Sequence, residues 1–236
     1  MTNIIGVGGC GNNILEFIKK QNLQDKKSNY KFISIKNNSE LASMDYNKND
    51  TVITISGLGG NTAGKLTNKI TKDIISNDGN VKNIIVLPFS MEFTIKQAIE
   101  ELEQLISINQ NIEIFANDDI LNETNRDKTM SELMKEYDKI IFDTIVKENQ
   151  REMKSFFIDI KKKDKIYKAI INFWSKSYKI TLVEPKCKMI DNSSIGNIAN
   201  HRFDFHQSIK SDSDKFIIDI EEIAIKKINE YIKNEK

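Results

Sequence analysis

The sequence predicts an α/β fold built on a doubly wound, mostly parallel sheet. Short runs rich in β-branched residues alternate with segments of helical apolar periodicity, and this alternation is typical of parallel sheets covered by helices. Two glycine-rich turns directly follow two of these runs, at the strand ends where α/β proteins bind ligands. The expected strands are Asn3–Val7, Tyr30–Ile35, Thr51–Ile55, Asn83–Leu87 and Ile112–Phe115.

Helices are expected between and after these strands. The apolar residues of 62–76 and of 95–106 each fall on one face at the 3.6-residue period. A long central helix is predicted over about 128–153, and a further apolar helix through 166–174. The remaining expectations are a strand over Lys179–Val183, a loop over 186–214 and an amphipathic helix over 216–233.

Composition excludes several classes of protein. The 236-residue chain has 35 basic and 34 acidic side chains and a net charge of +1, so no global field favours nucleic acid. No apolar run approaches the roughly 20 residues that span a bilayer, so we expect a cytoplasmic protein without direct membrane insertion. Cys10 and Cys187 form neither a disulfide framework nor a zinc motif. His201 and His206 suit a loop better than a metal site, so no metal held by the protein is predicted.

The two glycine turns, residues 5–13 and 56–65, indicate a phosphate ligand. Glycine permits tight turns and lets a ligand approach the backbone closely. A turn that opens a helix aims unpaired N–H groups and the positive end of the helix dipole at an anion. One such turn is common, whereas two suggest two grips on a polyphosphate and hence a nucleotide.

Each turn alone fits a known nucleotide motif incompletely. The first fits the dinucleotide fingerprint G-x-G-x-x-G, but the next strand ends at Ile35-Lys36, without the acidic residue that holds a ribose. The second fits the P-loop pattern G-x-x-x-x-G-K, but Leu66 stands where a Ser or Thr should bind Mg²⁺. An NAD-binding protein and a P-loop-like NTPase are therefore the weaker alternatives.

Three further motifs follow the two glycine turns in the chain: Pro88-Phe89-Ser90-Met91-Glu92, Asn117-Asp118-Asp119-Ile120-Leu121 and Glu136-Tyr137-Asp138-Lys139-Ile140-Ile141. Together the five motifs resemble the FtsZ/tubulin superfamily of GTP-binding, filament-forming proteins. The first turn resembles the first nucleotide loop of the family, which Asn13 closes, and residues 59–65 resemble its signature G-G-G-T-G-[ST]-G. The resemblance covers about residues 3–170 and is nearer to FtsZ than to eukaryotic tubulin.

The resemblance implies a site for GTP or GDP, with or without Mg²⁺. In the family, the glutamate that matches Glu92 reaches the ribose, and the aspartate that matches Asp138 accepts hydrogen bonds from guanine. Carried over to this sequence, the residues expected to bind nucleotide are Gly8, Gly9, Cys10, Gly11, Asn12, Asn13, Gly59, Gly60, Asn61, Thr62, Ala63, Gly64, Glu92 and Asp138.

The residues for GTP hydrolysis depart from the family pattern. FtsZ inserts an N-x-D-x-x-D loop from the next subunit, and counting without gaps from Asp138 places that loop on residues 159–164. Lys161 then replaces the first aspartate, which leaves Asp164 and Asp159 as the candidate catalytic carboxylates. A lysine ammonium cannot take a proton from water near neutral pH unless it is strongly desolvated, so GTPase activity stays an open question.

The expected domains are a GTP-binding domain with the central helix over 1–153 and a reduced C-terminal region over 154–236. The C-terminal region is expected to be too short for the usual four-stranded C-terminal domain of FtsZ.

Two functions follow from the resemblance. The first is an FtsZ-like cytoskeletal protein that self-associates into head-to-tail filaments with weak or altered GTP hydrolysis, in cell division or a related positioning process. The second is a GTP-binding regulator that does not polymerise and interacts with a true FtsZ.

Overall fold

The computed structural model divides the chain into two compact units, Met1–Glu152 and Met153–Lys236. The residues it describes are 1–22, 30–41, 50–89, 92–120, 127–148, 154–162, 165–174, 177–184 and 188–194, together with Ile223, Ile225, Lys226 and Glu230. Within these ranges, no helix is both long and apolar enough to cross a membrane. His201, His206 and Asp164 lie outside the described residues, as does most of the predicted C-terminal helix.

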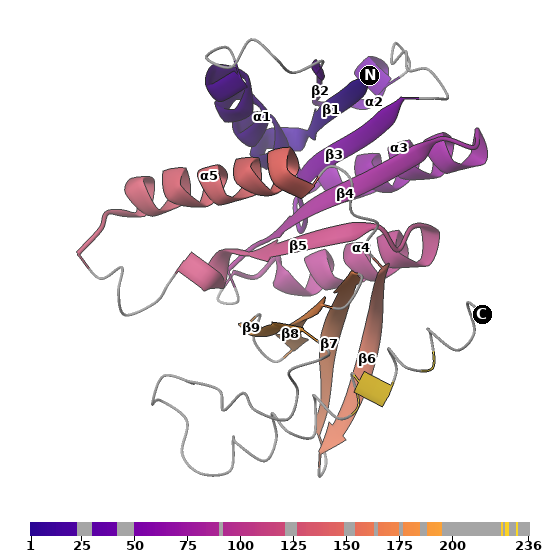
Figure 1. Cartoon of the computed structure of the whole chain (residues 1–236), viewed down its shortest axis with the longest axis vertical. Helices are drawn as coiled ribbons and strands as arrows, with labels where there is room; N and C mark the ends of the chain where they lie inside the picture. The colour runs from indigo at the N-terminus through magenta and orange to yellow at the C-terminus, as the bar shows by residue number, and fades with distance from the viewer. Residues whose placement is uncertain are drawn as a thin grey trace. The chain divides into compact units, whose positions relative to one another are not determined.

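The first unit contains a five-stranded, all-parallel sheet in the order β2-β1-β3-β4-β5 (Figure 1). The predicted doubly wound parallel sheet is therefore confirmed, and so are all five predicted strands. Both faces of the central strands are buried, which explains why they read as continuous apolar runs. The strands are β1 (Thr2–Val7), β2 (Tyr30–Ile35), β3 (Thr51–Gly57), β4 (Asn80–Leu87) and β5 (Ile112–Ala116).

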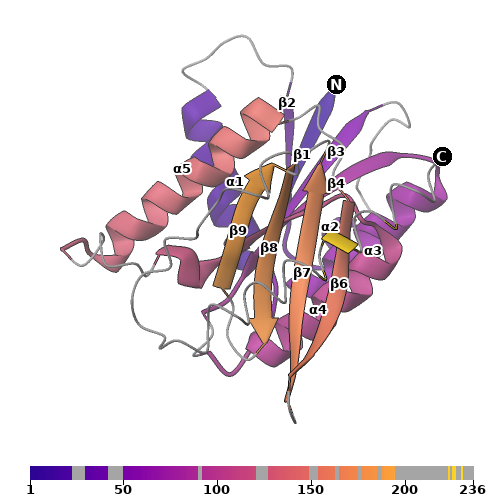
Figure 2. The ribbon, with the colours of Figure 1, turned by 60° about the horizontal axis from the view of Figure 1, so that its bottom comes forward.

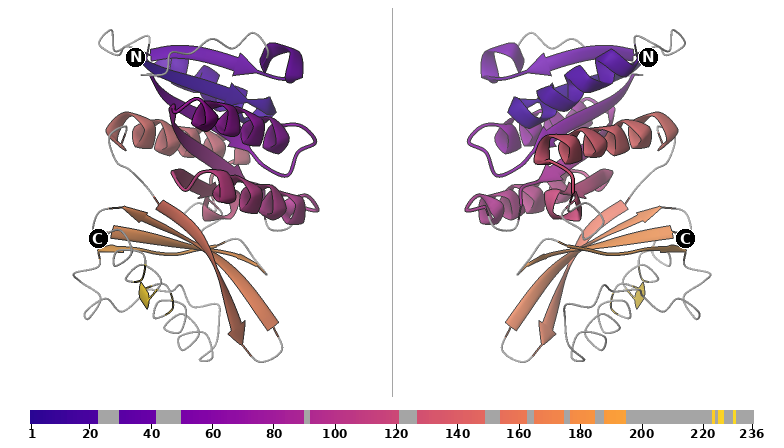
Figure 3. Two further views of the ribbon diagram at one scale, coloured as in Figure 1. Left: turned by 90° about the vertical axis from the view of Figure 1, so that its right-hand side faces the viewer. Right: turned by 90° about the vertical axis from the view of Figure 1, so that its left-hand side faces the viewer.

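Helices cover both faces of this sheet. Helices α1 and α5 lie on one face, and α3 and α4 on the other (Figure 3). The predicted helices over 62–76 and 95–106 are confirmed as α3 and α4, and the central helix as α5. The bounds are α1 (Gly8–Asn22), α2 (Asn38–Leu41), α3 (Ala63–Ser76), α4 (Ile95–Ile108) and α5 (Met130–Glu148), with a 3₁₀ turn η1 at Asn117–Ile120.

The strand order places the two glycine turns side by side. The chain runs outward from β1 to β2 and then returns past β1 to β3, so the order of winding reverses between β1 and β3. In open α/β sheets the ligand crevice lies at such a reversal, beyond the carboxyl ends of the two strands. One glycine turn follows β1 and the other follows β3, so both open at this crevice.

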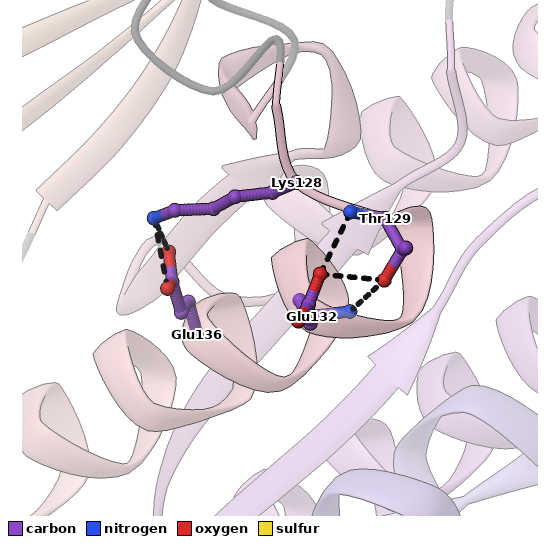
Figure 4. A network of polar contacts seen from close by, with 4 residues as sticks. All are labelled: Lys128, Thr129, Glu132 and Glu136. Carbon is purple, nitrogen blue, oxygen red and sulfur yellow. Dashed lines mark hydrogen bonds and ion pairs between the residues drawn. The ribbon is translucent and has the colours of Figure 1, made fainter.

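Helix α5 begins at a side-chain cap that determines where its later residues lie (Figure 4). The backbone N–H of Thr129 donates to the Glu132 carboxylate at 2.8 Å, and the Glu132 N–H donates back to Thr129 Oγ1 at 3.4 Å. This reciprocal pattern is a capping box, and it satisfies N–H groups that a helix start leaves unpaired. Lys128 adds an ion pair with Glu136, one helical turn further along, at 2.6 Å. The cap starts α5 at Met130, two residues later than the sequence indicates.

The second unit contains a four-stranded antiparallel sheet, seen face-on in Figure 2, with the order β6-β7-β8-β9. Its strands are β6 (Lys154–Lys162), β7 (Lys165–Trp174), β8 (Ser177–Glu184) and β9 (Lys188–Ser194). The predicted strand over Lys179–Val183 is confirmed as part of β8. The expectation that this region is too short for four strands is therefore wrong, because the strands begin at Lys154 and only two or three residues separate one from the next.

Two further sequence predictions for this unit are wrong. Residues 166–174, predicted as a helix, form β7, and β9 lies within the predicted loop 186–214. Residues 166–174 are rich in Ile, Tyr, Phe and Trp, which favour strands when a partner strand is available. Here β6 supplies that partner: Ile158 pairs with Ala169 in antiparallel register, and both are buried. Pairing with a neighbouring strand, which one segment alone does not show, decides the structure.

Candidate functional site

A cavity of about 870 Å³ lies at the carboxyl ends of the five parallel strands. The end of each strand supplies part of its lining: Gly8 after β1, Lys36 after β2, Leu58 after β3, Pro88 after β4 and Asn117 after β5. The remaining lining residues are Gly9, Cys10, Asn12, Asn13, Glu16, Ser34, Gly57, Gly59, Gly60, Asn61, Thr62, Ala63, Val86, Glu92 and Thr94. The cavity therefore occupies the ligand position typical of a doubly wound sheet.

The two glycine turns pack directly against each other. A Cβ added at Gly8 would lie 2.8 Å from the Cβ of Ala63, and one at Gly57 would lie 2.7 Å from the Cβ of Cys10. Gly8 and Gly59 both have positive φ values, of +70° and +87°, which only glycine adopts readily. A larger residue at Gly8 or Gly57 would push the two turns apart. These glycines therefore bring the turns together as one wall of the cavity.

Three helix N-termini reach the cavity. Helix α1 begins at Gly8, and Thr62 and Thr94 are the N-cap residues of α3 and α4. Unlike Thr129 at the start of α5, Thr62 and Thr94 make no side-chain capping bond within the described part of the chain. The first N–H groups of a helix have no partner inside the helix. These donors, with the positive ends of the helix dipoles, suit an anionic ligand.

Gly9 and Gly60 leave open space at the cavity surface. A Cβ at either position would meet no described atom within 4 Å, and both residues are exposed while lining the cavity. Packing of the described residues therefore gives no reason for glycine at these two positions. A ligand that lies directly on the backbone would give that reason.

Two buried acceptors in the cavity wall have no donor among the described residues. These are the side-chain oxygens Oδ1 of Asn12 and Asn117. The amide nitrogen of Asn12 is used internally, since it donates to the carbonyl oxygens of Gly8 at 2.6 Å and Ile35 at 3.2 Å. Buried polar atoms are normally hydrogen-bonded. Hydroxyl or N–H donors of a nucleoside would satisfy such acceptors, so the donor and acceptor set of the cavity fits a nucleotide.

Asp138 lies on α5, close to the first glycine turn. Burial raises the pKa of its carboxyl to about 6. Burial and, to a smaller extent, the charge of Asp138 raise the pKa of the Cys10 thiol to about 11, so Cys10 is a neutral thiol at physiological pH. Tyr137 holds this part of α5 in place, because its hydroxyl donates to the carbonyl oxygen of Ala116 at 2.7 Å and its ring packs edge-on against Phe115.

This arrangement matches a solved structure of CetZ from Methanosaeta thermophila strain DSM 6194. The match has a TM-score of 0.51 at 15% sequence identity and covers 63% of this chain and 54% of CetZ. The chain has an FtsZ/tubulin-like fold. A second match is an empty FtsZ dimer from M. jannaschii, with a TM-score of 0.48 and 18% identity, and it covers 61% of this chain and 52% of FtsZ. A third is the GDP-form TubZ protofilament structure from Bacillus thuringiensis serovar israelensis, with a TM-score of 0.44 and 12% identity, and it covers 62% of this chain and 51% of TubZ.

The resemblance is one of fold. No protein-family model matches the sequence, and no curated protein matches it. The chain spans about half the length of the CetZ and FtsZ chains that it matches. The fold expected from the FtsZ/tubulin-like motifs is therefore confirmed. The ligand, assembly and cellular role of this chain have to be inferred from the residues of the site.

The structure brings most of the predicted nucleotide contacts into one place. All of them line the cavity except Gly11, Gly64 and Asp138. A Cβ at Gly11 would overlap the carbonyl oxygen of Ile55, and one at Gly64 would overlap the carboxyl group of Glu101. These two glycines are therefore needed for packing within the protein. Lys65, the lysine of the P-loop-like pattern, is exposed and lies outside the lining.

Sequence reasoning missed several lining residues, among them Ser34, Lys36, Val86 and Thr94. A signal was available for two of them, since Lys36 directly follows a predicted parallel strand and Thr94 precedes a predicted helix. Glu16 was missed because it lies on α1 beyond the turn itself. It forms an exposed ion pair with Lys19 at 2.6 Å, and the hydrogen bond from Lys19 lowers the pKa of its carboxyl.

The ungapped count placed the predicted hydrolysis loop on residues that begin within a strand. Helix α5 ends at Glu148, and residues 154–162 form β6. Asp159 is an exposed strand residue paired with Lys168, and Lys161 pairs with Ile166 in the same ladder. The count assumed a central helix that continues to about residue 153, which is past the end of α5. The catalytic roles of Asp159 and Asp164 stay predictions that the structure does not test.

Proposed function

We propose that this protein binds GTP or GDP in the cavity at the strand ends and assembles through its nucleotide-binding unit, as an FtsZ-like cytoskeletal protein of the cytoplasm. The observation that carries the proposal is the direct packing of the two glycine turns, with uncapped helix N-termini facing one cavity. Backbone N–H groups from both turns supply donors for a polyphosphate. The charged side chains of the lining are Glu16 and Glu92, whose carboxylates repel a phosphate, and Lys36 at the end of β2. Backbone donors therefore supply most of the attraction for the phosphates.

A thermal-shift series with GTP, GDP, ATP and NAD tests the ligand. A ligand that binds only the folded protein stabilises it by mass action, by about 2.7 kcal/mol at a hundredfold excess over Kd. GTP and GDP are expected to raise Tm by roughly 5–10 °C, with smaller shifts for ATP and NAD. No shift with either guanine nucleotide, at millimolar concentration and with or without Mg²⁺, would contradict the proposal.

The substitution Gly60→Ala is expected to weaken GTP binding about tenfold without lowering the Tm of the unliganded protein. The added methyl group meets open space in the protein but occupies the cavity surface, and alanine restricts the unfolded chain slightly more than glycine does. Thermal shifts at several GTP concentrations measure both quantities. Lys65→Ala is the control and should bind GTP normally, because Lys65 lies two residues after Ala63, the last lining residue of this turn. A larger loss in Lys65→Ala than in Gly60→Ala would favour the P-loop-like alternative.

Assembly can be tested at Phe93, whose side chain is completely exposed between two lining residues, Glu92 and Thr94. If a second copy covers the nucleotide, Phe93 is buried at the contact, and burying such a side chain contributes about 1.5–3 kcal/mol. Phe93→Ser is therefore expected to raise the critical concentration for GTP-dependent light scattering about tenfold or more. Ile75→Ser is the control, because Ile75 is exposed near the far end of α3. GTP binding by a wild-type protein that never scatters light would favour the non-polymerising regulator of a true FtsZ.

A further inference from the structure

A buried glutamate outside the cavity lining contacts the second glycine turn. Glu101 lies on the apolar face of α4, with only 6% of its surface exposed, and it is outside the cavity lining. Burying a carboxylate costs free energy unless the group is hydrogen-bonded or paired. The proposed nucleotide site gives this side chain no role as a ligand, so its presence needs a separate explanation.

The contacts of Glu101 are with the backbone of the turn and with Gln97. Its carboxylate accepts a hydrogen bond from the Gly59 N–H at 2.9 Å and another from the Gln97 side chain at 2.9 Å. The same Gln97 nitrogen also donates to the carbonyl oxygen of Gly60 at 3.1 Å. Helix α4 therefore holds one backbone donor and one backbone acceptor of two consecutive turn residues.

Two glycines of the turn make room for this contact. Gly64 packs on the Glu101 carboxyl group so closely that a Cβ would overlap it. A Cβ at Gly59 would lie 2.8 Å from the carbonyl oxygen of Thr94, at the start of α4. Gly59 and Gly60 both line the cavity, and Gly60 is exposed there. The same short segment thus contacts both Glu101 and the cavity.

The charge of Glu101 cannot be what attracts a phosphate, because like charges repel. Its carboxylate instead offers a strong acceptor in a buried environment, where a hydrogen bond to a charged group is worth more than in water. Such a bond holds the Gly59–Gly60 segment in one conformation before any ligand arrives. A loop that is already ordered loses less entropy on binding, and its ligand binds more tightly.

We propose that Glu101, assisted by Gln97, is a positioning residue that presets the second glycine turn for a nucleotide polyphosphate. The ligand in this inference rests on the proposed function. The contact between Glu101 and Gly59 does not, and it can be measured in the unliganded protein.

Hydrogen exchange of the Gly59 amide tests the contact without nucleotide. In the full-length wild-type chain this amide should be protected, and Glu101→Ala should raise its exchange rate at least about tenfold, as expected for a lost bond to a charged acceptor. Glu100→Ala, which removes the exposed neighbouring carboxylate on α4, is the control and should leave the rate unchanged. Gly64→Ala alone should also raise the exchange rate of the Gly59 amide, because the added methyl group displaces Glu101. In a chain that already carries Glu101→Ala, it should raise the rate no further.

Calorimetric titration with GTP, at a temperature where every variant is folded, tests the positioning role. Glu101→Ala is expected to weaken binding about tenfold, whereas Glu101→Gln keeps an acceptor for the Gly59 N–H and should weaken it only about twofold to fourfold. In that variant the new amide group faces Gln97, which must turn and give up its bond to Gly60. Gln97→Ala should therefore match Glu101→Gln, and it provides a milder variant if Glu101→Ala does not fold.

Each outcome bears on a separate part of the inference. An unchanged Gly59 exchange rate in Glu101→Ala would overturn the contact itself. Fast exchange combined with unchanged GTP affinity would overturn the positioning role, leaving Glu101 as a purely structural residue. If the wild-type chain binds no GTP, the proposed function fails and the ligand named here fails with it, while the exchange data still decide whether Glu101 orders the turn.

Discussion

Replacing Gly11 with alanine is expected to lower the free energy of unfolding of the first unit by about 3 kcal/mol, the upper part of the range for overpacked sites. Gly11 is buried where α1 crosses β3, and an added Cβ would overlap the carbonyl oxygen of Ile55 and lie 2.9 Å from its carbonyl carbon. Neither atom can move without breaking the sheet, so α1 must shift away from β3. Urea denaturation followed by circular dichroism measures the loss.

Gly9→Ala is the matched control for Gly11→Ala. It makes the same chemical change two residues earlier in α1, but its Cβ meets no described atom within 4 Å. Its free energy of unfolding should stay within about 0.5 kcal/mol of the wild type. Equal destabilisation by the two substitutions would show that the close approach of α1 to β3 is not what makes Gly11 necessary.

The comparison of Gly11 with Gly9 shows how far the sequence could predict the site. The motif identified both as nucleotide contacts, because a glycine needed for ligand approach and one needed for helix packing look the same in a sequence. Only the neighbours of each backbone atom separate them: Ile55 lies against Gly11, whereas open cavity lies against Gly9. The position of the turns was predictable, since both follow strands, but their mutual contact depends on the strand order, which no local pattern contains.

The secondary structure was predictable where local preference and tertiary context agree. The central strands β1 and β4 are buried on both faces and bounded by turns, so their assignment did not depend on the partner strand. Residues 166–174 were different, because their apolar residues fit a helix or a strand equally well until β6 is placed beside them. Glu101 was overlooked for a related reason: on a predicted amphipathic helix, one acidic residue beside Leu102 looks like the edge of the polar face.

Asp138→Asn is expected to weaken GTP binding roughly 100-fold, because two hydrogen bonds to a charged acceptor are replaced by one neutral bond and one clash between donors. The carboxylate would accept from the N1–H and N2–H₂ groups of guanine, whereas an asparagine amide presents a donor to one of them. ATP binding should change little, so the ratio of the two affinities measures the contribution of Asp138. Asp127→Asn, at an exposed position before α5, is the control. Equal loss of ATP and GTP binding would contradict a role in reading guanine.

The pH dependence provides an independent test, because Asp138 affects stability and binding with opposite signs. Burial raises the pKa of its carboxyl from 3.8 to about 6 in the unliganded fold, so folding favours the protonated form. The contribution of Asp138 to stability is therefore largest below about pH 4 and is lost as the pH rises to about 6. Guanine requires the ionised form, so GTP affinity should rise through the same interval, by up to about tenfold per pH unit, and level off above pH 6. Titration calorimetry from pH 4.5 to 7.5 measures this rise, and Asp138→Asn should abolish it. A GTP affinity that falls as the pH rises would mean that Asp138 does not bind guanine as a carboxylate.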